Sequence, residues 1–409
     1  MYLRIYTHKE HTRIIAEDPT GPAPARHKST IHVPTAQPHI HSSAHRRIMT
    51  APSTPEYSRP SASEGSRPSS SEGSRPSPSG TLASSAESAQ NSFDVAIIGG
   101  GAGGLAASIA LARSLRSVVV IDAGQLRNSS SPHAHNVLGH EGIRPQDLVA
   151  KGRAEAADYG VAFIDATVQQ ARTIDSDPNL AEEAPRHRFE LTTSAGVDVR
   201  ARRIIIATGL SDELPDIPGL PEGWGGSVLH CPYCHGYEVR GQRIGVIGTT
   251  AMSYHQAMLF SQLSDHVSFI RHTAPAPDSE QDAMLETLGI EYIDSTVTEV
   301  VRTDSGTVVS LTADESADGA SPRTFDALAV GAYARANAEL FSQLGGEVVA
   351  HPSGMGTYIP TQMAGQTDVP GVWAVGNSAD VSAMVVAGTA SGVLAGAHVN
   401  ADLIMERLG

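Results

Sequence analysis

Short apolar runs that end at glycine or polar residues recur between residues 93 and 409 and predict the strands of an α/β protein. The first run, Phe93–Ile98, leads into the glycine-rich stretch 99–104 and then into a helix that we expect to continue to Arg116. A second run, Val118–Ile121, follows. This pattern predicts a unit of strand, glycine turn, helix and strand.

A second unit of the same layout occurs later in the chain, with further strands around it. Alternating polar and apolar residues before it are typical of a β-hairpin or meander. In order, the predicted elements are a hairpin or meander from 162–171 and 187–200, a buried strand at 203–209, a strand at 243–248, a helix at 252–263, a strand at 267–270, a hairpin within 291–312 that turns at 304–306, strands at 325–331 and 369–377, and a helix from about Ser382.

The first unit carries the spacing of a dinucleotide-binding turn. Gly99, Gly101 and Gly104 fit G-x-G-x-x-G, in which glycines let the backbone approach a pyrophosphate at the N-terminus of the following helix. Asp122, at the end of the next strand, occupies the position of a carboxylate that holds a ribose hydroxyl. A glycine-rich turn in some other α/β domain is less favoured, because strand, helix and acid are in register.

The second unit keeps the layout but not the glycines. Gly248 can form the tight turn, but Thr250 and Ser253 stand where the second and third glycines would be. The strand after it ends at Arg271 without a run of arginines. A second dinucleotide is therefore in doubt, and the use of NADPH stays open.

Residues 1–92 differ from the rest of the chain in composition. They are rich in Ser, Pro and His, and they repeat Ser-Glu-Gly-Ser-Arg-Pro-Ser at 63–69 and 71–77. Such a segment buries too little apolar surface to offset the entropy of ordering, so we expect a disordered low-complexity leader. It has ten lysines and arginines against seven acids, whereas 93–409 has nineteen against thirty-seven. An acidic body argues against a nucleic-acid surface, so no nucleic-acid partner is predicted.

We expect neither a signal peptide nor a membrane span from the sequence. The leader lacks the apolar run of a signal peptide, and acids such as Glu10 weaken a transit-peptide interpretation. Whether the leader belongs to the native protein or is an upstream extension is left open. The weakly polar run 382–399 is full of Gly, Ala and Ser and holds His398, so it predicts a packed helix.

The two cysteines of the 409-residue chain, Cys231 and Cys234, lie two residues apart between His230 and His235. Thiols at this spacing can close a small ring and tune one another's reactivity, so they predict a redox pair. A disulfide framework of a secreted protein is excluded, and a cytoplasmic location is expected. The alternatives are a buried pair and half of a zinc site. The flanking histidines abut the cysteines too closely to complete the zinc site, so no metal is predicted.

The segment 124–142 has the composition of a loop. It contains Arg127 and Asn128, together with the three histidines His133, His135 and His140. Such a loop after the acid can fold over a bound cofactor. A solvated surface loop is an equally good interpretation for each histidine taken singly.

Together, these pieces resemble the low-molecular-weight thioredoxin reductase family of flavoproteins over residues 93–409. The resemblance is carried by the first glycine turn with Asp122, by Ala207-Thr208-Gly209, by the cysteine pair, and by 371–377 before the C-terminal helix. It implies an α/β fold of two Rossmann-like nucleotide-binding domains. An FAD-binding domain in two parts, 93–215 and 335–409, would receive an inserted NAD(P)-binding-like domain, 216–334, that carries the cysteines.

The resemblance also implies FAD as the cofactor and a homodimer as the assembly. The implied flavin-site residues are Gly99, Gly101, Gly103, Gly104, Asp122, Arg127, Asn128, Val168, Ala207, Thr208, Gly209, Gly376, Asn377, Met384 and Val385.

Four positions depart from a thioredoxin reductase proper. His235 replaces the acid after the second cysteine, Thr250 interrupts the second glycine motif, the arginine cluster for the NADPH phosphate is absent around Arg271, and the Gly-Asp flavin motif reads Gly376-Asn377. The stretch Cys-Pro-Tyr-Cys-His-Gly is similar to that of the small-molecule dithiol oxidases that close the disulfides of gliotoxin and holomycin. Those relatives pass electrons from a dithiol to FAD and then to oxygen, without NADPH.

These resemblances favour a dithiol oxidase. A substrate thiolate would attack Cys231 of the oxidised pair, and a second substrate thiol would resolve the mixed disulfide. The enzyme dithiol would then be reoxidised through Cys234, which the resemblance places against the flavin. His235 is the predicted base and acid, because an imidazole takes a thiol proton near neutral pH. The alternative is a histidine that only packs beside the pair.

Two other functions remain as alternatives. One is an NAD(P)H-dependent disulfide reductase that acts on a thioredoxin-like protein or a small disulfide. The other is a non-enzymatic flavoprotein redox sensor whose leader binds a partner. The expected partner is a small-molecule dithiol or disulfide, with no nucleic acid and no membrane.

Overall fold

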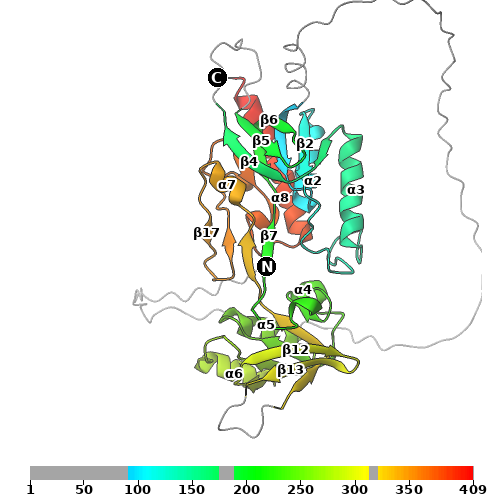
Figure 1. Ribbon diagram of the computed structural model, residues 1–409, viewed down its shortest axis with the longest axis vertical. Coiled ribbons are helices and arrows are strands. Elements are labelled where there is room, and N and C mark those ends of the chain that lie inside the picture. The colour runs from blue at the N-terminus through cyan, green and yellow to red at the C-terminus, as the bar shows by residue number, and fades with distance from the viewer. Residues whose placement is uncertain (1–90, 175–187, 313–320, 409) are drawn as a thin grey trace, which may run out of the picture. The chain divides into compact units, whose positions relative to one another are not determined.

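The computed structural model describes residues 91–174, 188–312 and 321–408 (Figure 1). The predicted leader, 1–92, lies outside the described residues except for its last two. The first strand begins at Ser92, one residue before the predicted start.

The first apolar run forms the centre of a seven-stranded sheet with the order β3-β2-β1-β6-β5-β4, in which β19 also pairs with β6. Strands β3, β2, β1, β6 and β19 run parallel, whereas β4, β5 and β6 form an antiparallel meander. The strands are β1 (Ser92–Ile98), β2 (Val118–Asp122), β3 (Ala162–Asp165), β4 (Val168–Thr173), β5 (Phe189–Thr193), β6 (Asp198–Ile206) and β19 (Val372–Ala374).

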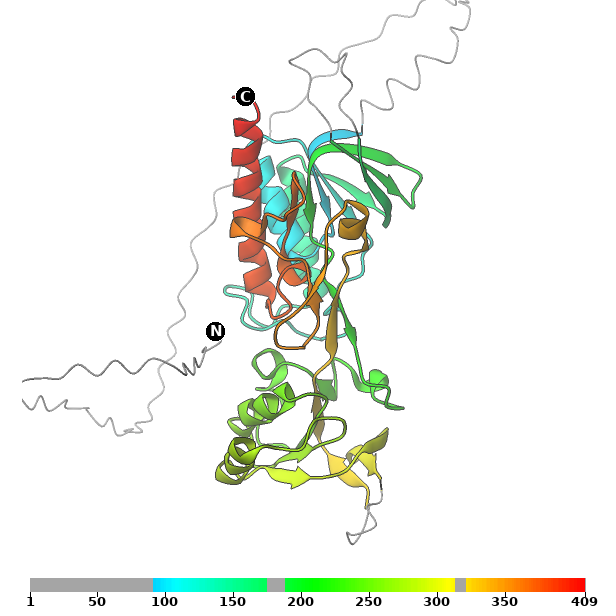
Figure 2. The same cartoon turned by 90° about the vertical axis from the view of Figure 1, so that its left-hand side faces the viewer.

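Both faces of this sheet are buried, which explains the unbroken apolar runs. Along β1, Val95 and Ile97 belong to the cluster on one face, whereas Ala96 and Ile98 belong to the cluster on the other. The first face packs against helices α2 (Ala102–Ala112) and α8 (Val385–Met405). Figure 2 shows α8, in red, running beside α2, in cyan. The α/β fold expected from the sequence is confirmed.

Glycines let α2 and α8 approach closely. A Cβ atom on Gly392 would lie 2.0 Å from the carbonyl oxygen of Gly103, and one on Gly396 would lie 2.9 Å from that of Ala107. Most of the weakly polar run 382–399, from Val385 onward, is thus part of a packed helix, as predicted. Among the described ranges of the chain, no helix is both long and apolar enough to cross a bilayer.

The second sheet has the order β11-β10-β9-β15-β8, and the three strands β12-β13-β14 form a separate sheet. The chain enters this part after β7 (Leu210–Glu213) and returns through β16 (Tyr333–Ala336), and these two strands pair antiparallel. The predicted domain boundaries, 215/216 and 334/335, lie next to β7 and within β16. The elements of this part are β8 (Val228–Leu229), α4 (Pro232–His235), β9 (Ile244–Ile247), α5 (Met252–Ser261), β10 (Val267–Ile270), α6 (Ser279–Thr287), β11 (Glu291–Ile293), β12 (Val297–Thr303), β13 (Gly306–Leu311), β14 (Arg323–Phe325) and β15 (Ala327–Val330).

Three further short elements follow β16 before the chain returns to β19. They are α7 (Glu339–Gln343), β17 (Val349–Ala350) and β18 (Thr357–Tyr358). In addition, α3 (Pro145–Asp158) follows the loop after β2.

Several predicted elements differ from those in the structure. The first helix ends at Ala112 instead of Arg116, because Leu115 adopts a left-handed φ of 61° and turns the chain back toward β2. The alternating stretch 162–171 is two strands instead of one: β3 joins β2 in parallel, and β4 pairs with β5. Strands β3 and β4 run in the same direction, and periodicity alone does not report which neighbour each of them pairs with.

Four of the described helices, α3, α4, α6 and α7, were not predicted. Helix α3 has Pro at its N-terminus, and α6 begins with a capping box in which Asp278 and Gln281 bond one another's backbone N–H groups. Both are start signals that can be read from a sequence.

Candidate functional site

The glycine turn after β1 is shaped by backbone that leaves no room for side chains. Gly99 has a φ of +108°, and a Cβ there would lie 2.3 Å from the carbonyl oxygen of Ala207. A Cβ on Gly104 would lie 2.0 Å from the oxygen of Gly99. At Gly101, by contrast, a Cβ would meet open space, and no side chain caps helix α2 there. The turn therefore presents first-turn N–H groups to a space that fits the pyrophosphate of a dinucleotide.

Two other predicted residues meet this turn. The Asp122 carboxylate reaches over Gly100, where a Cβ would be 2.6 Å from its Oδ2. The N–H group of Ala207 donates to the carbonyl oxygen of Ile98 at 2.8 Å, so the end of β6 adjoins the end of β1. Thr208 follows and donates its hydroxyl to the backbone oxygen of Asn337 at 2.5 Å. Gly209 completes this turn with a φ of +70°.

The residues after β19 bring a second helix N-terminus to the same place. Gly103 faces this segment, since a Cβ on it would lie 3.7 Å from the nitrogen of Gly376. Asn377 donates its amide to the backbone oxygens of Asp380 and Ala383 at 3.0 and 2.9 Å. This turn delays α8, which begins at Val385 instead of about Ser382.

No side chain caps α8, whose N-cap residue is Met384. Its first-turn N–H groups and positive potential are therefore available to a ring oxygen or nitrogen. The N-termini of α2 and α8 and the carboxylate of Asp122 therefore fit the pyrophosphate, the ring system and the ribose of an FAD molecule.

Val168 and Asn128 complete the predicted set. Val168 is buried in the core cluster that also holds Ile98 and Ile121, so its side chain supports the strands that lead into the turn. Asn128 is half-buried, and its carbonyl oxygen accepts from the N–H group of Ser131 at 3.1 Å.

The cysteine pair lies on α4, with Cys231 as the N-cap residue and Cys234 inside the helix. Both thiols are free and half-buried. The Cys234 thiol donates to Cys231, and this hydrogen bond, helped by backbone N–H groups and opposed by burial, lowers the pKa of Cys231 to about 7. The same hydrogen bond, together with burial, raises the pKa of Cys234. Cys231 is therefore the thiolate of the reduced pair and Cys234 the protonated thiol.

Arg127 bonds the segment after β19 and also acts on the cysteine pair through its charge. It forms a bidentate ion pair with Asp212, at 2.8 and 2.7 Å, and donates to Oδ1 of Asn377 at 3.1 Å. Its positive charge also lowers the pKa of Cys231, as a smaller effect than the Cys234 hydrogen bond. Arg127 was predicted as a flavin-site residue. Its partner Asp212 was not predicted, and nothing in the short, mostly polar strand β7 marks it.

His235 contacts the loop between β2 and α3. Its Nε2 atom lies 2.6 Å from the hydroxyl oxygen of Ser131, and its ring meets that of His135 edge to face at 6.4 Å. Burial lowers the pKa of His235, while the charge of Glu238 opposes this change. In the same loop, Asn136 donates its amide to the backbone oxygen of Tyr233 at 2.8 Å. The loop was predicted to cover a cofactor, but the specific roles of Ser131 and Asn136 were not.

His230, on the other side of the pair, is held apart from this loop. Its Nδ1 atom lies 3.2 Å from the carbonyl oxygen of Val330, and burial lowers its pKa. Its own carbonyl oxygen accepts from the amide of Gln256 at 2.6 Å.

In the turn after β9, backbone N–H groups are bonded by a nearby side chain. The hydroxyl oxygen of Ser253 accepts from the N–H groups of Thr249 and Thr250, at 3.0 and 3.3 Å. These are the groups that would bind a phosphate in a dinucleotide site. Arg271 is paired with Asp294. The residues of this second unit therefore fit NADPH less well than those of the first unit fit FAD.

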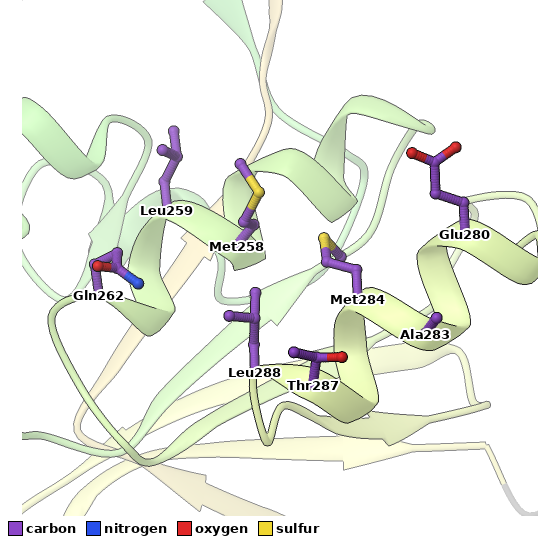
Figure 3. Close-up of a pocket in the computed structure, with 8 residues that line it drawn as sticks. All are labelled: Met258, Leu259, Gln262, Glu280, Ala283, Met284, Thr287 and Leu288. Carbon is purple, nitrogen blue, oxygen red and sulfur yellow. The ribbon is translucent and has the colours of Figure 1, made fainter. Parts of the chain in front are cut away.

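An apolar groove of about 550 Å³ lies between α5 and α6 (Figure 3). Met258, Met284 and Leu288 are among the side chains that line it, and none of the predicted site residues does. We do not assign the substrate to it, because the reactive thiols lie elsewhere. Within the described parts of the chain, no cluster of three His, Cys, Asp or Glu side chains is arranged to hold a metal ion.

Known proteins with similar sequences bear names from one enzyme group. Thioredoxin reductase tcpT from Claviceps purpurea (strain 20.1) is 35% identical over 187 residues, which are 44% of this chain and 56% of that protein. The match thus spans about half the length of that relative. Thioredoxin reductase sirT from Leptosphaeria maculans is 28% identical over 340 residues, or 75% of this chain and 93% of that protein.

The crystal structure of HlmI is also similar, with 38% sequence identity and a TM-score of 0.68 over 78% of this chain and 94% of that one. The sequence model of the pyridine nucleotide-disulphide oxidoreductases matches residues 93–392. The chain therefore belongs to the pyridine nucleotide-disulphide oxidoreductase family.

Proposed function

We propose that the enzyme oxidises a small-molecule dithiol to a disulfide, with oxygen as the final acceptor, through Cys231 and Cys234. The observation that carries this proposal is the closed turn after β9. Ser253 occupies the backbone N–H groups of Thr249 and Thr250, and Arg271 is paired with Asp294, so the usual binding groups for NADPH are already engaged. Electrons would then enter from the dithiol instead of from NADPH.

The first half of the reaction uses the oxidised cysteine pair. A substrate thiolate attacks the sulfur of Cys231, the bond between Cys231 and Cys234 breaks, and Cys234 leaves with the electron pair. The raised pKa of Cys234 favours its protonation at once. The product of this step is a mixed disulfide between the substrate and Cys231.

The second half closes the substrate disulfide. His235 accepts the proton of the second substrate thiol, whose sulfur attacks the substrate sulfur of the mixed disulfide. Cys231 leaves as a thiolate, which its pKa of about 7 makes a good leaving group. The substrate has lost two electrons and two protons: Cys234 is a thiol, His235 carries the other proton, and Cys231 is a thiolate. Bound FAD supplies the two-electron acceptor that restores the cysteine disulfide and passes the electrons to oxygen.

The residues that would hold FAD are those that converge at the carboxyl ends of the parallel strands. Gly99, Gly101, Gly103 and Gly104 form the pyrophosphate cradle, and Asp122 accepts from a ribose hydroxyl. The remaining members of the proposed site are Arg127, Asn128, Val168, Ala207, Thr208, Gly209, Gly376, Asn377, Met384 and Val385. The open space at Gly101 and the uncapped N-termini of α2 and α8 support this assignment.

A reductase driven by NAD(P)H is the second candidate. The family match and the retained fold of β9, α5 and β10 favour it, and its substrate would be a thioredoxin-like protein or a small disulfide. The redox-sensor alternative depended on the leader, which lies outside the described residues.

An anaerobic titration of the bound flavin distinguishes the two candidates. NADPH, NADH and dithiothreitol are added in parallel to the FAD-loaded enzyme, and air is then admitted. We expect dithiothreitol to bleach the flavin, the two nucleotides to leave it oxidised, and air to restore the colour with formation of hydrogen peroxide. The double variant Cys231→Ser/Cys234→Ser is the control, in which dithiothreitol should act far more slowly. Rapid bleaching by NADPH would contradict the proposal.

We also infer a homodimer and a cytoplasmic location. Helix α8 exposes an apolar face, on which Val386, Val393, Leu394, Ile404 and Met405 are 38–63% exposed. No exposed residue of α8 is charged. A second copy of the chain, presenting the same face, would cover this surface symmetrically. The cytoplasmic location is supported by the use of both cysteines as a redox pair, and cell fractionation tests it.

A further inference from the structure

Ser131 is a buried serine of the loop between β2 and α3, and its hydroxyl group lies between two partners. The hydroxyl oxygen is 2.7 Å from the carbonyl oxygen of His133 and 2.6 Å from Nε2 of His235. Both distances are those of good hydrogen bonds. The loop belongs to the part of the chain that contains the glycine turn, whereas His235 directly follows Cys234.

Counting protons assigns the tautomer of His235. A carbonyl oxygen can only accept, so the single hydroxyl proton of Ser131 is donated to His133. Toward His235 the hydroxyl oxygen must then accept, which requires a proton on Nε2. In a neutral imidazole the other nitrogen, Nδ1, carries a lone pair.

Two neighbouring residues of the same loop keep this geometry in place. Asn136, with a left-handed φ of 60°, donates to the backbone oxygen of Tyr233, inside α4. His135 lies edge to face with His235 and is itself bonded through Nδ1 to Glu141 at 2.7 Å. The loop thus contacts α4 at three points, which are the backbone oxygen of Tyr233, the ring of His235 and the Nε2 atom of His235.

We propose that Ser131 is a positioning residue that holds His235 as the Nε2–H tautomer, so that Nδ1 accepts the proton of a reacting thiol. The role of Nδ1 rests on the proposed function, whereas the tautomer does not. Burial lowers the pKa of His235, which favours the neutral imidazole. The charged or titratable groups that face its ring are Glu238 on its own segment and His135 on the loop.

Histidine NMR tests the tautomer directly. The full-length, FAD-loaded enzyme is prepared with isotope-labelled histidine, reduced, and studied above the pKa of His235. The signal of His235 is identified by its loss in His235→Asn. We expect the attached proton on Nε2 in the native enzyme and in Ser131→Thr, and a mixture of tautomers in Ser131→Ala. A proton on Nδ1 in the native enzyme would overturn the proposal, whether or not Ser131→Ala folds.

Kinetics test the consequence. The rate of flavin reduction by dithiothreitol is measured across pH for Ser131→Ala, Ser131→Thr and Ser129→Ala. Ser129 is an exposed serine of the same turn whose carbonyl oxygen, not its hydroxyl, bonds Gln146, so it is a matched control. We expect Ser131→Ala to be slower by about tenfold, the factor of one ordinary hydrogen bond, with an altered pH profile. Ser131→Thr should restore both.

Equal rates and pH profiles in Ser131→Ala and Ser129→Ala would refute the positioning role. Failure of the proposed function would be recognised by a different result. Bleaching of the native flavin by NADPH would contradict the oxidase proposal but would not affect the tautomer assigned to His235.

Discussion

Removing the Cys234 thiol should raise the pKa of Cys231. The hydrogen bond from Cys234 is the largest cause of the low pKa of Cys231, which is about 7 instead of the ordinary 9.0. At pH 7 a thiol with the lower pKa is about half thiolate, and one with the ordinary value is about 1% thiolate. If the whole effect came from Cys234, the variant Cys234→Ala would react about fiftyfold more slowly at pH 7.

Two other contributions remain in this variant. The backbone N–H groups of residues 233 and 234 and the charge of Arg127 still favour the Cys231 thiolate. We therefore expect a loss of between about fivefold and fiftyfold in alkylation by iodoacetamide at pH 7. The whole curve of rate against pH should move to higher pH, because a more basic thiol needs a higher pH to ionise.

The sequence offers a matched control for this measurement. It contains two cysteines, so each variant at position 234 leaves Cys231 as the single alkylation site. Cys234→Ser keeps a donor at this position, and its curve should stay near the native midpoint of about 7. Identical midpoints for the Ala and Ser variants would show that the hydrogen bond is not the cause and that the backbone and Arg127 are.

Two further predictions follow from the glycine turn and from α8. The Gly101→Ala variant should fold normally yet lose at least about tenfold in FAD affinity, because its methyl group would enter only the space of the pyrophosphate. The Gly104→Ala variant should instead have a lower melting temperature, because its Cβ would lie 2.0 Å from the oxygen of Gly99. Circular dichroism and flavin absorbance per protein separate the two, and a flavin-saturated Gly101→Ala would contradict the assignment. Val393→Lys should halve the mass measured by light scattering if α8 forms the dimer contact, whereas Leu115→Lys, which changes an exposed leucine off that helix, should not. A dimer that survives Val393→Lys would place the contact elsewhere.

The parts of the fold that the sequence predicts well are those whose signal is local. Few sequences fit a buried strand followed by positions at which any Cβ atom would collide with the backbone. Phe93–Ile98 and the glycine turn after it can therefore be predicted from the sequence. The end of the first helix is harder to predict. The helix ends where Leu115 turns the chain toward β2, and the direction of the chain after that point depends on strand pairing. The same holds for 162–171, where β3 and β4 follow one another closely in the chain but pair with different neighbours.

The least predictable feature of the candidate site is the set of contacts between distant segments. Ser131 and His235 are separated by 104 positions, and Arg127 and Asp212 by 85. Neither Ser131 nor Asp212 has a distinctive sequence context, because a loop serine and an acid in a short polar strand are common. At Ser253 the sequence and the structure agree but supply different information. The missing glycine at this position predicted a poor phosphate site. The hydrogen bonds to Ser253 from Thr249 and Thr250 give the physical reason why the site is poor. A hydroxyl that satisfies these N–H groups must be displaced before a phosphate can bind, and that cost falls on NADPH but not on FAD, whose turn has no such side chain at Gly101.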